Sequence, residues 1–85
     1  MWEELNNKLC IHLEFKDFAE AMGFVNEVSL KAEMINHHPT WTNTWNKVDI
    51  VLCTHDAGDK ITEKDKKLAK MIDDILIKYH LNKQE

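Results

Sequence analysis

Three of the five histidines of this 85-residue chain fall between residues 33 and 55. His37 and His38 are adjacent and stand immediately before Pro39, whereas His55 follows a later apolar run. Imidazole has an unperturbed pKa of about 6.5, so it donates and accepts protons near neutral pH. If the three side chains converge, they suit general acid–base chemistry. Glu33 lies one helical turn before His37, so we expect its carboxylate to orient or charge-stabilise that imidazole.

Two other interpretations of the histidines stay open from spacing alone. In one, zinc is bound by His37 or His38, by His55, and by Glu33 or Cys53, because zinc accepts nitrogen, sulfur and oxygen ligands. The HxH, HxxxH and CxxC spacings that favour such a site are absent. In the other, His37 caps the C-terminus of a helix, where the helix dipole favours a cation, and His38 is simply exposed.

Length and composition indicate one globular domain. The chain is close to the usual domain size of about 100 residues, and its residues are 44% hydrophobic and 31% charged. The net charge of −4 disfavours nucleic acids and anionic membranes, which attract clustered Lys and Arg. The basic residues between 64 and 70 are interleaved with acidic ones, as on a solvated helix face. We therefore expect no nucleic-acid partner and no membrane partner.

The two cysteines bear on the cellular compartment. Cys10 and Cys53 belong to no CxxC pair, and the sequence shows neither a secretory signal pattern nor an apolar run long enough to span a bilayer. We expect two free thiols in a reducing cytoplasm. A Cys10–Cys53 disulfide stays open, because sequence does not give the separation of the two α-carbons.

The first half of the chain predicts two strands and a helix. A short strand begins near Trp2 and ends at the Asn6–Asn7 turn, and residues 9–15 alternate as a half-buried strand. Asp17 is a good N-cap, with Glu20 placed to close a capping box. The apolar residues every three or four positions predict a helix from about residue 18 to about residue 36. They are Phe18, Met22, Val25, Val28, Ala32 and Ile35.

The second half repeats this order. Residues 41–45 and 48–54 predict two antiparallel strands joined by a turn at Asn46–Lys47. Alternation puts residues 48, 50 and 52 on the core face and His55 on the opposite face, with residues 51 and 53. A loop pivots at Gly58, Thr62 and Asp65 form a capping box, and the helix that follows buries Leu68, Ile72, Ile75 and Tyr79. Residues 81–85 are expected to fray.

This order, strand, strand, helix, strand, strand, helix, predicts the fold class. Two helices that are each apolar on one face can cover one side of a four-stranded antiparallel sheet. We therefore expect an α+β domain spanning residues 1–85.

A linked set of motifs resembles the pterin-4a-carbinolamine dehydratase family. The set is Glu33-x3-His37-His38-Pro39-x-Trp41, then Trp45 and Val48, then Leu52-x-Thr54-His55, then Thr62-x-x-Asp65, preceded by Phe15-Lys16-Asp17-Phe18. The double histidine with proline is weak by itself, but the linked spacings make the resemblance specific. It covers nearly the whole chain, from about Trp2 to Ile75.

The resemblance implies an enzyme, a hydro-lyase (4a-hydroxytetrahydrobiopterin dehydratase) that converts 4a-hydroxytetrahydropterin into quinonoid dihydropterin and water and so recycles the pterin. It implies no metal and no cofactor. It places His37, His38 and His55 around the pterin as catalytic groups. The residues it implies for binding or orienting are Glu33, Pro39, Trp41, Thr54 and Asp65. Family members form homodimers or homotetramers, so we expect self-association here.

The sequence also departs from the family pattern. Members commonly have a helix before the first tryptophan, whereas this sequence begins at Met1-Trp2, which bears on the oligomer interface more than on the chemistry. Asn36 stands where an acidic residue is common, and the loop between His55 and Asp65 is one residue longer than in many relatives. The alternative function is a non-catalytic protein-interaction or regulatory module on the same fold, although retention of all three histidines argues against it.

Overall fold

The computed structural model describes residues 1–79 and confirms the predicted α+β class and element order. Its elements are β1 (Glu3–Leu5), β2 (Lys8–Glu14), α1 (Phe18–Met34), β3 (Thr40–Thr44), β4 (Lys47–Leu52) and α2 (Glu63–Leu76). Short 3₁₀ turns cover His55–Ala57 and Ile77–Tyr79. The prediction of a frayed tail at residues 81–85 lies outside the described residues.

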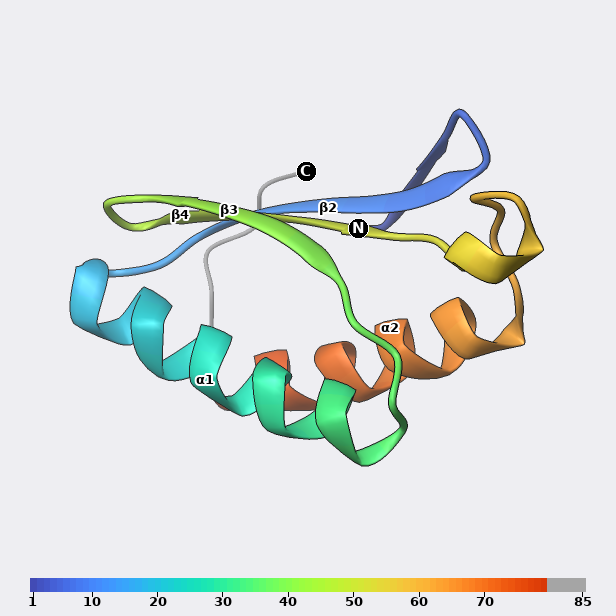
Figure 1. Ribbon diagram of the computed structural model, residues 1–85. Helices are drawn as coiled ribbons and strands as arrows, with labels where there is room; N and C mark the ends of the chain where they lie inside the picture. The colour runs from blue at the N-terminus through green and yellow to red at the C-terminus, as the bar shows by residue number, and fades with distance from the viewer. Residues whose placement is uncertain (80–85) are drawn as a thin grey trace.

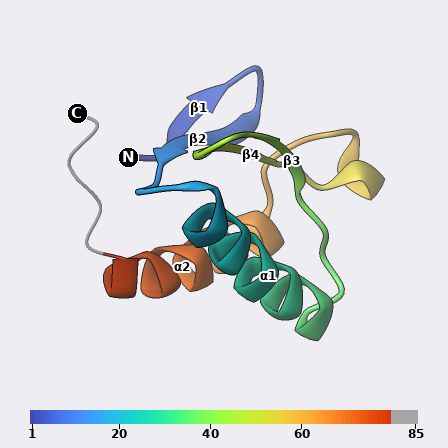
Figure 2. The same cartoon turned by 90° about the vertical axis from the view of Figure 1, so that its left-hand side faces the viewer.

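The four strands form one antiparallel sheet in the order β1-β2-β4-β3. Both helices lie against the same face of the sheet, as Figures 1 and 2 show from two directions. In the described part of the chain, no helix covers the other sheet face. The domain therefore has two layers and one apolar core between them.

The core confirms the predicted alternation in β4. Val48, Ile50 and Leu52 are at most 1% exposed, and each points toward the helices. Phe24 of α1 packs against Phe15 with ring centroids 4.9 Å apart. Burial of one such side chain contributes about 1.5–3 kcal/mol, so these residues set which sheet face is covered.

Helix α1 buries only part of the predicted stripe: Val28 and Ala32 are buried as predicted, but Ala21 and Phe24 take the place of the other predicted core residues. The buried positions are Ala21, Phe24, Val28 and Ala32, whereas Phe18 is 48% exposed. Val25 and Ile35 are half-buried at the edge of the core. The buried face is shifted because α1 packs against α2 as well as the sheet, and helical periodicity alone does not show which neighbours a helix has.

Capping determines where α1 begins and ends. The Asp17 carboxylate accepts the Glu20 N–H at 2.8 Å, as predicted, but the Glu20 carboxylate accepts the N–H of Lys16 instead of that of Asp17. The helix ends at Met34, two residues before the predicted end. There Asn36 takes a left-handed φ of 51° and closes a C-terminal cap of the Schellman type.

The connections around β4 also differ slightly from expectation. The hairpin turn lies at Trp45–Asn46, one residue earlier than predicted, and Trp45 has a φ of 52°. β4 ends at Leu52, and Thr54 forms an isolated bridge with Lys60. The capping box of Thr62 and Asp65 is present, as predicted.

Candidate active site

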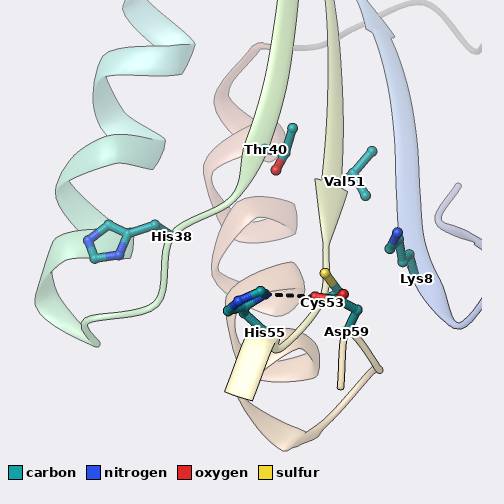
Figure 3. A pocket seen from close by; sticks show the side chains of 7 residues that line it. All are labelled: Lys8, His38, Thr40, Val51, Cys53, His55 and Asp59. Carbon is teal, nitrogen blue, oxygen red and sulfur yellow. Dashed lines mark hydrogen bonds and ion pairs between the residues drawn. The ribbon is translucent and has the colours of Figure 1, made fainter. Parts of the chain in front are cut away.

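Three segments meet at one end of the molecule: the end of α1, the turn at residues 55–57 that follows β4, and the start of α2 (Figure 1). Two adjoining cavities lie at this end. The larger, of about 390 Å³, is lined by Lys8, His38, Thr40, Val51, Cys53, His55 and Asp59 (Figure 3). The smaller, of about 280 Å³, is lined by Asn36, His37, His38, Cys53, Thr54, His55, Asp56 and Lys64. His38, Cys53 and His55 line both cavities. The structure thus brings the three histidines together.

His37 is held by a carboxylate from α2. Its Nε2 lies 2.6 Å from Asp65 Oδ1, and both residues are buried, with His37 8% and Asp65 0% exposed. Asp65 Oδ2 accepts the Thr54 hydroxyl and the Thr62 backbone N–H, each at 2.8 Å. Asp65 therefore joins the N-terminal cap of α2 to the imidazole that follows α1.

The charge of Asp65 sets the tautomer of His37. Burial alone would raise the pKa of the Asp65 carboxyl, but hydrogen bonds from His37, the Thr62 N–H and Thr54 outweigh it and lower the pKa. An ionised carboxylate only accepts hydrogen bonds, so His37 donates from Nε2. In the neutral imidazole, Nδ1 is then an acceptor, which suits a general base.

Glu33 contacts His38 and not His37. Glu33 Oε1 accepts from His38 Nε2 at 3.0 Å, and the two side chains are 78% and 59% exposed. The expected Glu33–His37 relation requires an unbroken helix. α1 has already ended at Met34, and Asn36 turns the chain away, so the carboxylate meets the next imidazole instead.

The helix-cap interpretation of His37 holds for its backbone alone. The His37 N–H donates to the Ala32 carbonyl at 3.0 Å, as the second bond of the Schellman cap requires. Its side chain is bonded to Asp65. His38 is exposed, as that interpretation expects, but it also lines both cavities.

His55 lies in the 3₁₀ turn after β4 and is paired within that loop. Its Nδ1 donates to Asp59 Oδ1 at 2.9 Å (Figure 3). The hydrogen bond that Asp59 accepts is the largest cause that raises the pKa of His55. The charge of Asp59 adds to it, with a smaller contribution from the charge of Asp56. Val51 and Cys53 share its cavity, so His55 lies beside the residues that strand alternation predicted.

The remaining candidate residues are placed less directly. Thr54 is buried, its hydroxyl donates to Asp65, and it also lines the smaller cavity. Trp41 pairs with Ile50 across β3 and β4 and packs against the core, on the helix side of the sheet. Pro39 is half-buried. Neither Trp41 nor Pro39 lines either of these two cavities.

The sequence analysis did not identify several residues that line the cavities. Asp59 lies four residues after His55, yet nothing local indicated that Gly58, with a φ of 84°, would fold the loop back. Lys8 lies at the start of β2, and the antiparallel register of β2 with β4 brings it to the larger cavity. The alternation of β2 puts Lys8 on the sheet face away from the helices, but many surface residues share this property, so it did not single out Lys8.

The zinc interpretation finds no cluster in the described residues. Within residues 1–79, no group of three or more His, Cys, Asp and Glu side chains is arranged to bind a metal ion. Cys10 and Cys53 are free thiols, as expected. None of the helices in this part of the chain is both long and apolar enough to cross a membrane.

Comparison with known proteins decides the family. Residues 1–75 match the family model described as pterin 4 alpha carbinolamine dehydratase. The chain belongs to this family.

Curated relatives agree with the family assignment. A protein of Burkholderia pseudomallei (strain 1710b) named "Putative pterin-4-alpha-carbinolamine dehydratase" is 52% identical over 63 residues, which is 74% of this chain and 61% of that protein. A protein of the same name from Burkholderia cenocepacia (strain HI2424) is 56% identical over 61 residues, or 72% of this chain and 59% of the relative. The matched segment thus spans about three fifths of these dehydratases.

Two solved structures share the dehydratase fold. A "transcriptional coactivator/pterin dehydratase" from Brucella melitensis superposes with a TM-score of 0.82 at 37% identity, over 87% of this chain and 80% of that one. A pterin dehydratase-like protein described as a RuBisCO assembly factor in the alpha-carboxysome gives a TM-score of 0.74 at 19% identity, over 87% of each chain. The second likeness shows the fold alone.

Proposed function

We propose that this chain dehydrates 4a-hydroxytetrahydropterin to quinonoid dihydropterin and water by histidine acid–base catalysis. One observation carries the proposal: three histidines meet at adjoining cavities, and each has one ring nitrogen on a carboxylate and the other left for a ligand. Such pairing sets which ring nitrogen carries a proton before the substrate arrives. Membership of the family supplies the substrate class.

The reaction breaks the C4a–O bond, takes the proton from N5 and forms the C4a=N5 double bond. His55 is the acid that protonates the departing hydroxyl, because Asp59 raises its pKa and favours the imidazolium form. His37 is the base that accepts the N5 proton, because Asp65 holds it as the Nε2–H tautomer. His38 stands between the cavities and contacts the substrate, with Glu33 fixing its ring.

The test is turnover of the 4a-carbinolamine by purified protein, followed by ultraviolet absorbance without added metal. Positioned acid–base groups contribute about 10²- to 10⁴-fold, so His37→Ala and His55→Ala each lose at least about a hundredfold in kcat/KM, and His38→Ala also loses activity. No turnover by the wild type, or equal turnover by wild type and His38→Ala, would disprove the proposal.

His12→Ala is the matched control. His12 Nδ1 is also paired with a carboxylate, at 2.7 Å from Asp49 Oδ1, but the pair lies on the open sheet face and lines neither cavity. Exposed substitutions of this kind change the free energy of unfolding by less than about 0.5 kcal/mol, so the variant stays folded. Because His12 lies outside both cavities, the variant's activity stays within about twofold of the wild type.

We also propose that the chain self-associates in the cytoplasm as a homodimer or homotetramer. β1 and β3 are the two sheet edges, and β3 presents exposed residues at alternate positions. An unpaired strand edge is a template for pairing with a second copy. Light scattering after gel filtration gives the molar mass, and a monomer at micromolar concentration would contradict self-association.

A further inference from the structure

The larger cavity extends well beyond the histidines. Figure 3 shows His38 on one side of the view and Lys8 of β2 on the other, with Thr40 of β3 and Val51 of β4 between them. His37, assigned above to the N5 proton, lines the smaller cavity. The larger cavity therefore has room and chemistry that the proposed proton transfers do not use.

Pterin chemistry indicates what occupies this space. The carbon C6 is bonded directly to N5, so a substituent on C6 leaves the ring beside the reacting edge. With that edge near His37, the substituent passes the shared residues His38, Cys53 and His55 and enters the larger cavity. In this orientation the C6 side chain would end on the side where Lys8 lies.

Lys8 is a cation with no ion-pair partner within residues 1–79. It is half-buried at the start of β2, and its side chain takes part in no ion pair or hydrogen bond in the described part of the chain. Asp59 is the carboxylate of the same cavity, but it already accepts from His55. An ammonium group that lines a cavity without an ion-pair partner favours an anionic oxygen ligand.

We propose that Lys8 selects pterins whose C6 side chain carries an anionic group, either phosphate or carboxylate. The inference rests on the proposed function, since it assumes that the pterin ring lies at the histidines. It adds a substrate class: the anionic group reaches the Lys8 ammonium through the larger cavity, while the ring is held by His38 and His55.

The test is equilibrium binding of dihydroneopterin and dihydroneopterin 3′-phosphate, a pair that differs by the phosphate. One charge-assisted hydrogen bond corresponds to about a tenfold tighter binding of the phosphate by the wild type. The preference disappears in Lys8→Met, reverses in Lys8→Glu and survives in Lys8→Arg. It also weakens as salt concentration rises, because the contact is partly exposed.

Lys47→Met is the matched control. Lys47 is on the same sheet face as Lys8, but it lies at the end of β4 away from the larger cavity and lines neither cavity. Its loss therefore leaves the phosphate preference intact. Circular dichroism checks that each variant is folded, and the expected reversal in Lys8→Glu keeps the test informative if Lys8→Met does not fold.

The outcomes separate this inference from the proposed function. A phosphate preference that persists in Lys8→Met, or no preference in the wild type, overturns the role of Lys8, even if the 4a-carbinolamine is turned over normally. If neither pterin binds and no carbinolamine is dehydrated, the pterin site itself is disproved, and the role of Lys8 with it.

Discussion

His37 Nε2 lies 2.6 Å from Asp65 Oδ1, and this buried contact joins the end of α1 to the first turn of α2. Asp65 uses its other oxygen to complete the α2 capping box, so one carboxylate serves both the helix and the imidazole. Any change in Asp65 should therefore alter stability and chemistry together.

Asp65→Asn tests this double role. The amide keeps the volume of the carboxylate, but one of its two sides becomes a donor facing either His37 or the Thr62 N–H. One buried polar group then loses its partner, and we expect about 1–3 kcal/mol lower free energy of unfolding in urea. We also expect a fall in kcat, because the tautomer of His37 is no longer fixed.

Asp74→Asn is the control for this substitution. Asp74 is exposed on α2 and has a weak contact with Lys70 at 3.5 Å, so its loss changes stability by less than about 0.5 kcal/mol. Equal effects of the two substitutions would show that Asp65 has no special role.

The lowered pKa of Asp65 also predicts an acid dependence of stability. Because the folded pKa lies below the unfolded value of about 3.9, the contribution is present above that value and is lost as pH falls through the folded pKa. Unfolding measured between about pH 2 and pH 5 should show a steeper loss of stability in the wild type than in Asp65→Asn. Parallel curves would contradict this assignment.

Asp59→Asn tests the charge state of His55. Asp59 raises the pKa of His55 by its hydrogen bond and its charge, so the substitution should bring the imidazole back toward its ordinary pKa of about 6.5. The imidazolium is the proposed acid, so the fall in rate on the alkaline side should begin at lower pH in the variant. A two-dimensional NMR titration of the histidines gives the pKa itself.

Asp56→Asn is the graded control for this shift. Asp56 acts on His55 by charge alone and is the smallest of the contributions that raise its pKa. We expect a smaller downward shift of the His55 pKa than in Asp59→Asn.

The pH dependence of stability that arises from His55 has the opposite sign to that from Asp65. The stability from the His55–Asp59 pair is present below about pH 6.5 and is lost as pH rises through the raised pKa of His55.

Glu33→Gln distinguishes the two possible partners of Glu33. The structure pairs Glu33 with His38, so the substitution should change the imidazole NMR signals of His38 and leave those of His37 unaltered. Because both side chains are largely exposed, their interaction energy is at most about 1 kcal/mol. If all of it acts on the transition state, kcat/KM falls by less than about fivefold. A change of NMR signals confined to His37 would contradict this pairing.

The sequence by itself determined the elements of this protein and the sheet face that they bury. Alternation at Val48, Ile50 and Leu52 indicated the core face, and the Thr62–Asp65 pair marked the start of α2, because these patterns arise from contacts within a few residues. The family motif identified the three histidines in the same way, since it is read from order and spacing along the chain.

Tertiary structure alone decided which partner each site residue has. Asn36 has a left-handed conformation just after α1, and the turn that it makes lets Glu33 pair with His38. The packing of α2 places Asp65 against His37. Antiparallel register places Lys8 in the same cavity as His55. Such pairings depend on how separate elements pack, and hydrophobic periodicity specifies the buried face of an element without specifying the neighbour that covers it.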